Sequence, residues 1–138
     1  AKAKEKNVAL IGARDLDPEE RESLRQSRIS VFTMQDIDEM GMKRVMRQAL
    51  AAALDGTEGF VLSLDMDALD PLEAPGVGTP VRGGLTYREA HLAMELLAET
   101  GALIAMEVVE VNPVLDTRNQ TAELAVELIA SALGKRII

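Results

Sequence analysis

The segment from Phe60 to Gly84 constrains the fold most, because an apolar run turns abruptly into a loop rich in acids, glycines and prolines. The run from Phe60 to Leu64 has the length and apolar character of a buried strand. Three carboxylates follow within six residues, those of Asp65, Asp67 and Asp70. Burying a carboxylate costs several kcal/mol unless a cation or strong hydrogen-bond donors compensate. The segment therefore predicts a strand that ends at a charged site.

The spacing of Asp65 and Asp67 indicates what this charged site binds. Side chains at positions i and i+2 of a strand point to the same face, so we expect both carboxylates to converge. Carboxylate oxygens suit Mg²⁺, Ca²⁺ or Mn²⁺, and such a metal can activate water for hydrolysis. Four glycines and three prolines between positions 71 and 84 predict a loop of fixed shape beside the acids. Two alternatives remain, a purely structural metal site and acids that only cap the next loop or face water.

The composition of the chain excludes several classes of partner. Its 138 residues are enough for one domain, which we expect to span 1–138. The net charge of −8 argues against binding to nucleic acid or to an anionic membrane surface. No apolar run is long enough to cross a bilayer, and the first seven residues lack the apolar core of a signal peptide. There is no cysteine, and a cytoplasmic location is expected. The single histidine, His91, is expected to be an ordinary helical residue, so imidazole ligands for a metal would have to come from elsewhere.

The order of the expected elements predicts an α/β fold. Apolar runs predict strands at 8–12, 29–33, 59–65 and 102–111, and apolar residues at helical spacing predict helices at 41–54, 86–100 and 120–133. Pro18 and the acids that follow it predict a further helix at 18–26. Asp17 before Pro18 and the pair Thr86 and Glu89 are helix-capping signals, whereas residues 34–40 are expected to form a short connection. Alternating strands and helices predict a three-layer αβα architecture with a mainly parallel sheet covered on both faces. The carboxyl end of the last strand would place Glu110 level with Asp65, where an unpaired acid suits a cationic substrate.

Several motifs resemble those of arginases, members of the ureohydrolase family. The segments that carry the resemblance are SLDMDALDP, APGVGTPVRGGLTYRE and EVVEVNPVLD, supported by GARDLDPEE and VFTMQDIDEMGM. The resemblance covers nearly the whole chain, but it matches only about the carboxyl-terminal half of the family pattern. It implies a partial arginase-like αβα fold and manganese-dependent hydrolysis of L-arginine to L-ornithine and urea.

The resemblance also implies a role for each acid of the site. Asp65 would bridge two manganese ions and Asp67 would bind one of them, so that a hydroxide bridging the metals attacks the guanidinium carbon. Glu110 would orient the guanidinium group, with Thr79 beside it. Asp70 would fix the loop.

Residues outside the segment 65–84, here called the acidic loop, receive roles from the same resemblance. Asp17 would bind the α-amino group of the substrate, with Glu20 as a second contact, although the helix cap alone could explain Asp17. Arg88 and Glu89 match positions at the subunit interface, which implies a homo-trimer or homo-hexamer.

The first half of the family pattern, which carries the histidine ligands and the proton-shuttle histidine, has no counterpart here. We therefore expect this chain to be inactive alone, to need the missing N-terminal half as a partner, and to leave a sheet edge and an apolar flank uncovered. The alternatives are an agmatinase or another ureohydrolase, against which Asp17 is expected to favour arginine, and a non-catalytic ureohydrolase-like assembly module.

Overall fold

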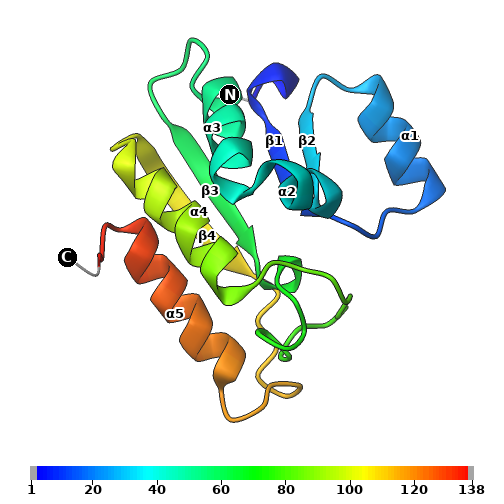
Figure 1. Ribbon diagram of the computed structural model, residues 1–138, viewed down its shortest axis with the longest axis vertical. Helices are drawn as coiled ribbons and strands as arrows, with labels where there is room; N and C mark the ends of the chain where they lie inside the picture. Colours follow the sequence, from blue (N-terminus) through cyan, green and yellow to red (C-terminus); the bar gives the residue numbers. More distant parts are fainter. Residues whose placement is uncertain (1–2, 137–138) are drawn as a thin grey trace.

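The computed structural model describes residues 3–136, which form an α/β fold with two separate parallel sheets (Figure 1). In chain order the elements are β1 (Ala9–Ala13), α1 (Pro18–Gln26), β2 (Ser30–Thr33), α2 (Met34–Met40), α3 (Met42–Ala53), β3 (Phe60–Asp65), α4 (Tyr87–Glu99), β4 (Leu103–Val109) and α5 (Gln120–Ala132). Short 3-10 turns occupy Glu5–Asn7 and Met66–Ala68. No helix between residues 3 and 136 has both the length and the apolar character needed to cross a membrane.

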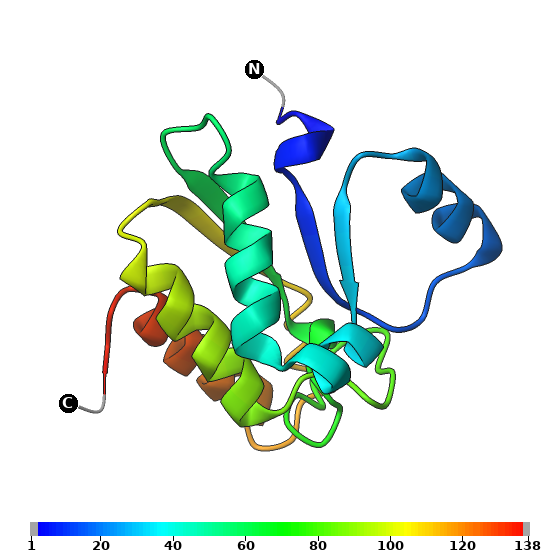
Figure 2. The ribbon, with the colours of Figure 1, turned by 45° about the horizontal axis from the view of Figure 1, so that its top comes forward.

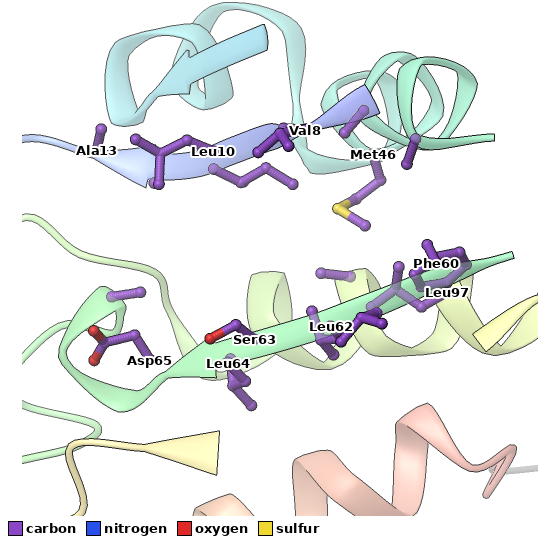
Figure 3. Close-up of a pocket in the computed structure, with 18 of the residues that line it drawn as sticks. Val8, Leu10, Ala13, Met46, Phe60, Leu62, Ser63, Leu64, Asp65 and Leu97 are labelled. Carbon is purple, nitrogen blue, oxygen red and sulfur yellow. The ribbon is translucent and has the colours of Figure 1, made fainter. Parts of the chain in front are cut away.

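Each sheet consists of one pair of parallel strands. β1 pairs with β2, and β3 pairs with β4, with Asp65 opposite Val109 at the carboxyl ends of the second pair. The predicted parallel α/β class is therefore confirmed. The expected single sheet is interrupted, however, because β1 and β3 are not paired within the described part of the chain. The two strands face each other across a cavity instead (Figure 3).

The core lies between the β3–β4 pair and the helices α3, α4 and α5 (Figures 1 and 2). It is built from aliphatic residues and methionines, because aromatic residues make up only 2% of the chain. Met66 and Leu128 are completely buried. The other face of the pair is open, since 66% of Val61 and 68% of Ile104 is exposed. Helices thus cover one face of this pair rather than the expected two.

Helix starts follow the capping signals of the sequence. The Asp17 carboxylate accepts hydrogen bonds from the amides of Glu19 and Glu20, both at 2.8 Å, and Glu20 accepts from the Asp17 amide at 3.1 Å. Thr86 and Glu89 make the same reciprocal arrangement at the start of α4. These bonds satisfy amide groups that have no partner inside the helix.

Helix α2 occupies residues that were expected to form a connection, and that prediction is wrong. Thr33 Oγ1 accepts a hydrogen bond from the Asp36 amide at 3.2 Å, and Asp36 Oδ2 accepts one from the Thr33 amide at 2.7 Å. This is a capping box with aspartate in the place of the usual glutamate. Gly41, with φ +78°, ends the helix through a bond from its amide to the Ile37 carbonyl.

Candidate active site

A cavity of about 1150 Å³ separates the β1–β2 pair from the β3–β4 pair. Apolar side chains line it along the strands, including Leu10, Met46 and Leu62, and Asp65 lies at the end toward which β3 points (Figure 3). The lining at that end also includes Glu20, Asp67 and Thr79. The carboxyl ends of parallel strands, where ligand sites form in open α/β sheets, thus carry the polar part of the cavity.

Asp65 and Asp67 line the same cavity, but not for the reason inferred from their spacing. β3 ends at Asp65, and Asp67 belongs to a 3-10 turn rather than to the strand. The Asp65 carboxylate accepts a hydrogen bond from the Asp67 amide at 3.0 Å, and this bond stabilises the turn. The expectation that both side chains point from the same face of one extended strand is therefore wrong, although the two acids do lie together.

Thr79 and Glu110 complete the acidic end of the site. Thr79 Oγ1 donates a hydrogen bond to Asp67 Oδ2 at 2.7 Å. The Glu110 carboxylate lies against Gly78, where a Cβ atom on the glycine would be 3.7 Å from Oε2. Glu110 has φ +65°, a left-handed conformation that glutamate rarely adopts. β4 ends one residue earlier, so this backbone turn rather than strand alternation sets the direction of Glu110.

Burial, together with the neighbouring negative charges of Asp67 and Glu110, raises the pKa of Asp65 above its ordinary value. A hydrogen bond from the Asp67 amide acts in the opposite direction and does not cancel the increase. The carboxylates of Asp67 and Glu110 therefore each repel that of Asp65. A bound cation would relieve this repulsion, which suits a metal or a cationic ligand.

The residues present fit only part of a metal site. Among residues 3–136 no group of three histidine, cysteine or acidic side chains is arranged to hold a metal ion. Asp65 and Asp67 supply hard oxygen donors of the kind that Mn²⁺ and Mg²⁺ prefer. Two carboxylates fall short of the six ligands that such ions usually take, so further ligands must come from another segment or from solvent.

Asp70 holds the two ends of the acidic loop together. Its carboxylate accepts hydrogen bonds from the amides of Leu72 at 3.0 Å, Gly83 at 2.8 Å and Gly84 at 3.3 Å. These bonds, that from Leu72 most strongly, lower the pKa of Asp70. Asp70 therefore fixes the shape of the loop that carries Thr79.

The remaining predicted site residues differ in whether they line the cavity. Glu20 lines the cavity, whereas Asp17 and Glu110 are not among the described residues that line it. Asp17 is used as the cap of α1. Arg88 forms an exposed ion pair with Glu95 at 3.4 Å, and Glu89 caps α4. The interface role of Arg88 and Glu89 stays a prediction.

The sequence analysis missed Arg14, which follows β1 directly. Its guanidinium group donates to five backbone carbonyls, those of Asp67, Ala68, Leu69, Val81 and Arg82. The available signal was an arginine at the carboxyl end of a strand, level with the acids. His91, as expected, packs as an ordinary helical residue; it is buried between α4 and α5, with Nδ1 2.9 Å from Ser131 Oγ.

The pattern of the arginase family matches residues 1–134. This chain belongs to the arginase family. The arginase of Bacillus caldovelox is 52% identical over 137 residues, which are 99% of this chain and 46% of that protein. Its solved structure superposes with a TM-score of 0.95 over 98% of this chain and 45% of the other. Formimidoylglutamase from Bacillus subtilis shares the fold at 28% identity, with a TM-score of 0.89 over 94% of this chain and 41% of that one. The chain thus spans less than half the length of these relatives.

Proposed function

We propose that this chain carries part of the active site of a manganese-dependent arginase, which hydrolyses L-arginine to L-ornithine and urea in the cytoplasm. The observation that carries the proposal is the gathering of Asp65, Asp67 and Thr79 at one end of the cavity, with Glu110 beside them. The identity of 52% with the arginase of B. caldovelox supports the same reaction.

Asp65 and Asp67 are the proposed manganese ligands. Their oxygens suit this ion, and the raised pKa of Asp65 indicates a site where negative charge needs compensation. When bound, the metal would act as a Lewis acid that activates water and polarises the substrate. Because two carboxylates are too few, the remaining ligands are proposed to come from the part of a full-length arginase that this chain does not span.

Glu110 and the start of α1 are proposed to bind opposite ends of the substrate. The Glu110 carboxylate would attract and orient the guanidinium group, while Thr79 helps to shape that end of the site. Glu20, which lines the cavity, and Asp17 would bind the α-amino group. Agmatine keeps this amine and lacks only the carboxylate, so Asp17 alone does not distinguish the two compounds, and agmatine must be assayed directly.

The proposed partner is the missing N-terminal half of the enzyme. The chain covers 46% of the B. caldovelox arginase, and the edges of β1 and β3 that are unpaired within residues 3–136 border the cavity. Unpaired strand edges and apolar walls favour the addition of further secondary structure. Arg88 and Glu89 remain the proposed contacts of a homo-trimer or homo-hexamer.

The test is urea release from L-arginine with added Mn²⁺. We expect no activity from the chain alone and activity after it is co-refolded with the N-terminal half of the B. caldovelox arginase. Asp67→Ala should abolish that activity, whereas Asp38→Ala, at an exposed position of α2, should preserve it. L-Arginine should be preferred over agmatine.

Other outcomes point to the alternatives. Robust activity of the chain alone would overturn the claim that further ligands are needed. A preference for agmatine would favour an agmatinase. A folded mixture without activity on either compound would favour the non-catalytic assembly module, which the shortage of metal ligands among the described residues also supports.

A further inference from the structure

Arg14 connects the start of α1, which the proposed function assigns to the α-amino group, with the loop that carries the proposed metal ligand Asp67. It lies between the end of β1 and the Asp17–Glu20 capping box. Its side chain reaches both arms of the acidic loop, which are the turn at residues 67–69 and the segment at residues 81–82. One side chain therefore joins the start of α1 to the metal-binding acids.

The hydrogen bonds of Arg14 are numerous and well distributed. Nη2 donates to the carbonyls of Val81 at 2.6 Å, Asp67 at 2.8 Å and Leu69 at 3.3 Å. Nη1 donates to the Ala68 carbonyl at 3.3 Å, and Nε donates to Val81 at 3.2 Å and Arg82 at 3.3 Å. The planar guanidinium presents five donors in a fixed fork, so it holds both arms in one relative position.

These bonds cross the gap between the two sheets at the end of the cavity where Asp65 and Asp67 lie. β1 and β3 share no ladder of backbone hydrogen bonds in the described residues, so ladder register does not set their separation. The shortest bond to the turn ends on the carbonyl of Asp67 itself. Movement of Arg14 would therefore shift Asp67 relative to the Asp17–Glu20 capping box.

We propose that Arg14 is a positioning residue that sets the distance between the metal-binding acids and the α-amino-binding start of α1. This inference rests on the proposed function. It makes Arg14 a determinant of substrate length, because an amino acid with a guanidinium side chain must span both places at once. A substrate with one more methylene would fit the fixed distance badly and would be rejected.

The kinetic test compares L-arginine with L-homoarginine, which is longer by one methylene. A rigid site discriminates against one methylene by about 10- to 200-fold in kcat/KM. Arg14→Met in the enzyme reconstituted with the N-terminal half should reduce this ratio about tenfold, mainly through a higher KM for L-arginine. Arg14→Lys should give an intermediate ratio, since one ammonium cannot reach both arms. Arg25→Met, at an exposed position of α1, is the matched control.

A second measurement does not depend on catalysis. Hydrogen exchange of the 138-residue chain, followed by mass spectrometry, should be faster at residues 67–69 and 81–85 in Arg14→Met than in Arg25→Met. If the reconstituted wild type lacks activity, the proposed function fails, and this measurement still decides whether Arg14 fixes the loop. Equal loss of activity on both substrates, or unchanged exchange, would overturn the positioning role.

Discussion

Gly84 leaves no room for a side chain where the acidic loop returns to its starting point. A Cβ atom at this position would lie 2.4 Å from the carbonyl carbon of Leu69 and 2.5 Å from the amide nitrogen of Asp70. Both are backbone atoms, and the Leu69 side chain is 1% exposed, so the neighbouring chain has little space to retreat. The glycine is required for this close approach rather than for flexibility.

Gly84→Ala should therefore destabilise the protein. Overpacking of this kind costs about 1–3 kcal/mol, and urea unfolding followed by circular dichroism would measure the change in the free energy of unfolding. Gly78→Ala is the control, because its Cβ would meet Glu110 Oε2 at a comfortable 3.7 Å. Equal free energies of unfolding for the two variants would show that the loop adapts.

For individual residues, local sequence patterns predicted the helix caps but not the contacts between residues distant in the chain. Asp17 and Thr86 could be identified because a cap bonds to amides two or three positions away. Asp65 and Asp67 were identified by their chemistry, while the 3-10 turn that places Asp67 was missed. The partners of Arg14 lie 53 to 68 positions along the chain, and a single sequence does not encode such a pairing in any local pattern.

Helix α5 is capped by Asp116, which lies before the first residue of the helix. Asp116 accepts hydrogen bonds from the amides of Thr117, Thr121 and Ala122 at 2.9–3.2 Å. Burial alone would raise the pKa of Asp116, but these bonds and the Thr121 side chain hold it below the ordinary value. The side chain of Asn119, the N-cap residue, makes no capping hydrogen bond, and the ionised Asp116 carboxylate caps the helix instead.

Asp116→Ala should destabilise α5 by about 1 kcal/mol at pH 7. Because the folded state has the lower pKa, the contribution of the carboxylate is fully present above the unfolded pKa of about 3.9. It is lost as the pH falls through the folded pKa. Urea midpoints for wild type and variant should therefore differ at pH 7 and converge below about pH 4. Asp38→Ala, at an exposed position of α2, is the control, and its urea midpoint should equal that of the wild type at pH 7.

Apolar residues at helical spacing predicted α3, α4 and α5 to within one residue at each end. The capping signals at Asp17 and Pro18 predicted α1 with the same bounds that the structure shows. Helix α2 was not predicted, because its seven residues give a weak helical pattern and its capping box uses Asp36 in place of glutamate. Short helices depend on their ends and on packing more than on their own propensity.

For the whole molecule, the open face of the β3–β4 pair is the main departure from a closed αβα sandwich. Val61 and Ile104 project from adjacent strands on this face and are 66% and 68% exposed. Alternation of strands and helices predicted parallel pairing, but it does not specify which β-α-β units share an edge. The missing first half of the family pattern predicted an uncovered sheet edge, but nothing in the sequence placed that edge between β1 and β3.

The isolated chain should associate through this open face. Sedimentation velocity should show a weight-average sedimentation coefficient that rises with concentration, and Val61→Thr with Ile104→Thr should reduce that rise, because less apolar area would be buried on contact. Leu72→Thr is the control, since Leu72 is 86% exposed but lies in the acidic loop. Association unchanged by the double substitution would place the contact elsewhere.

The left-handed backbone of Glu110 has a consequence for how such a chain can change over generations. Outside glycine, asparagine and aspartate, this conformation costs about 1–2 kcal/mol, so selection for folding alone would drive position 110 toward glycine or asparagine. Only a functional benefit of the Glu110 carboxylate would oppose such substitutions. A library screened for thermal tolerance would accordingly enrich the substitutions Glu110→Gly and Glu110→Asn, and one screened for turnover would keep glutamate.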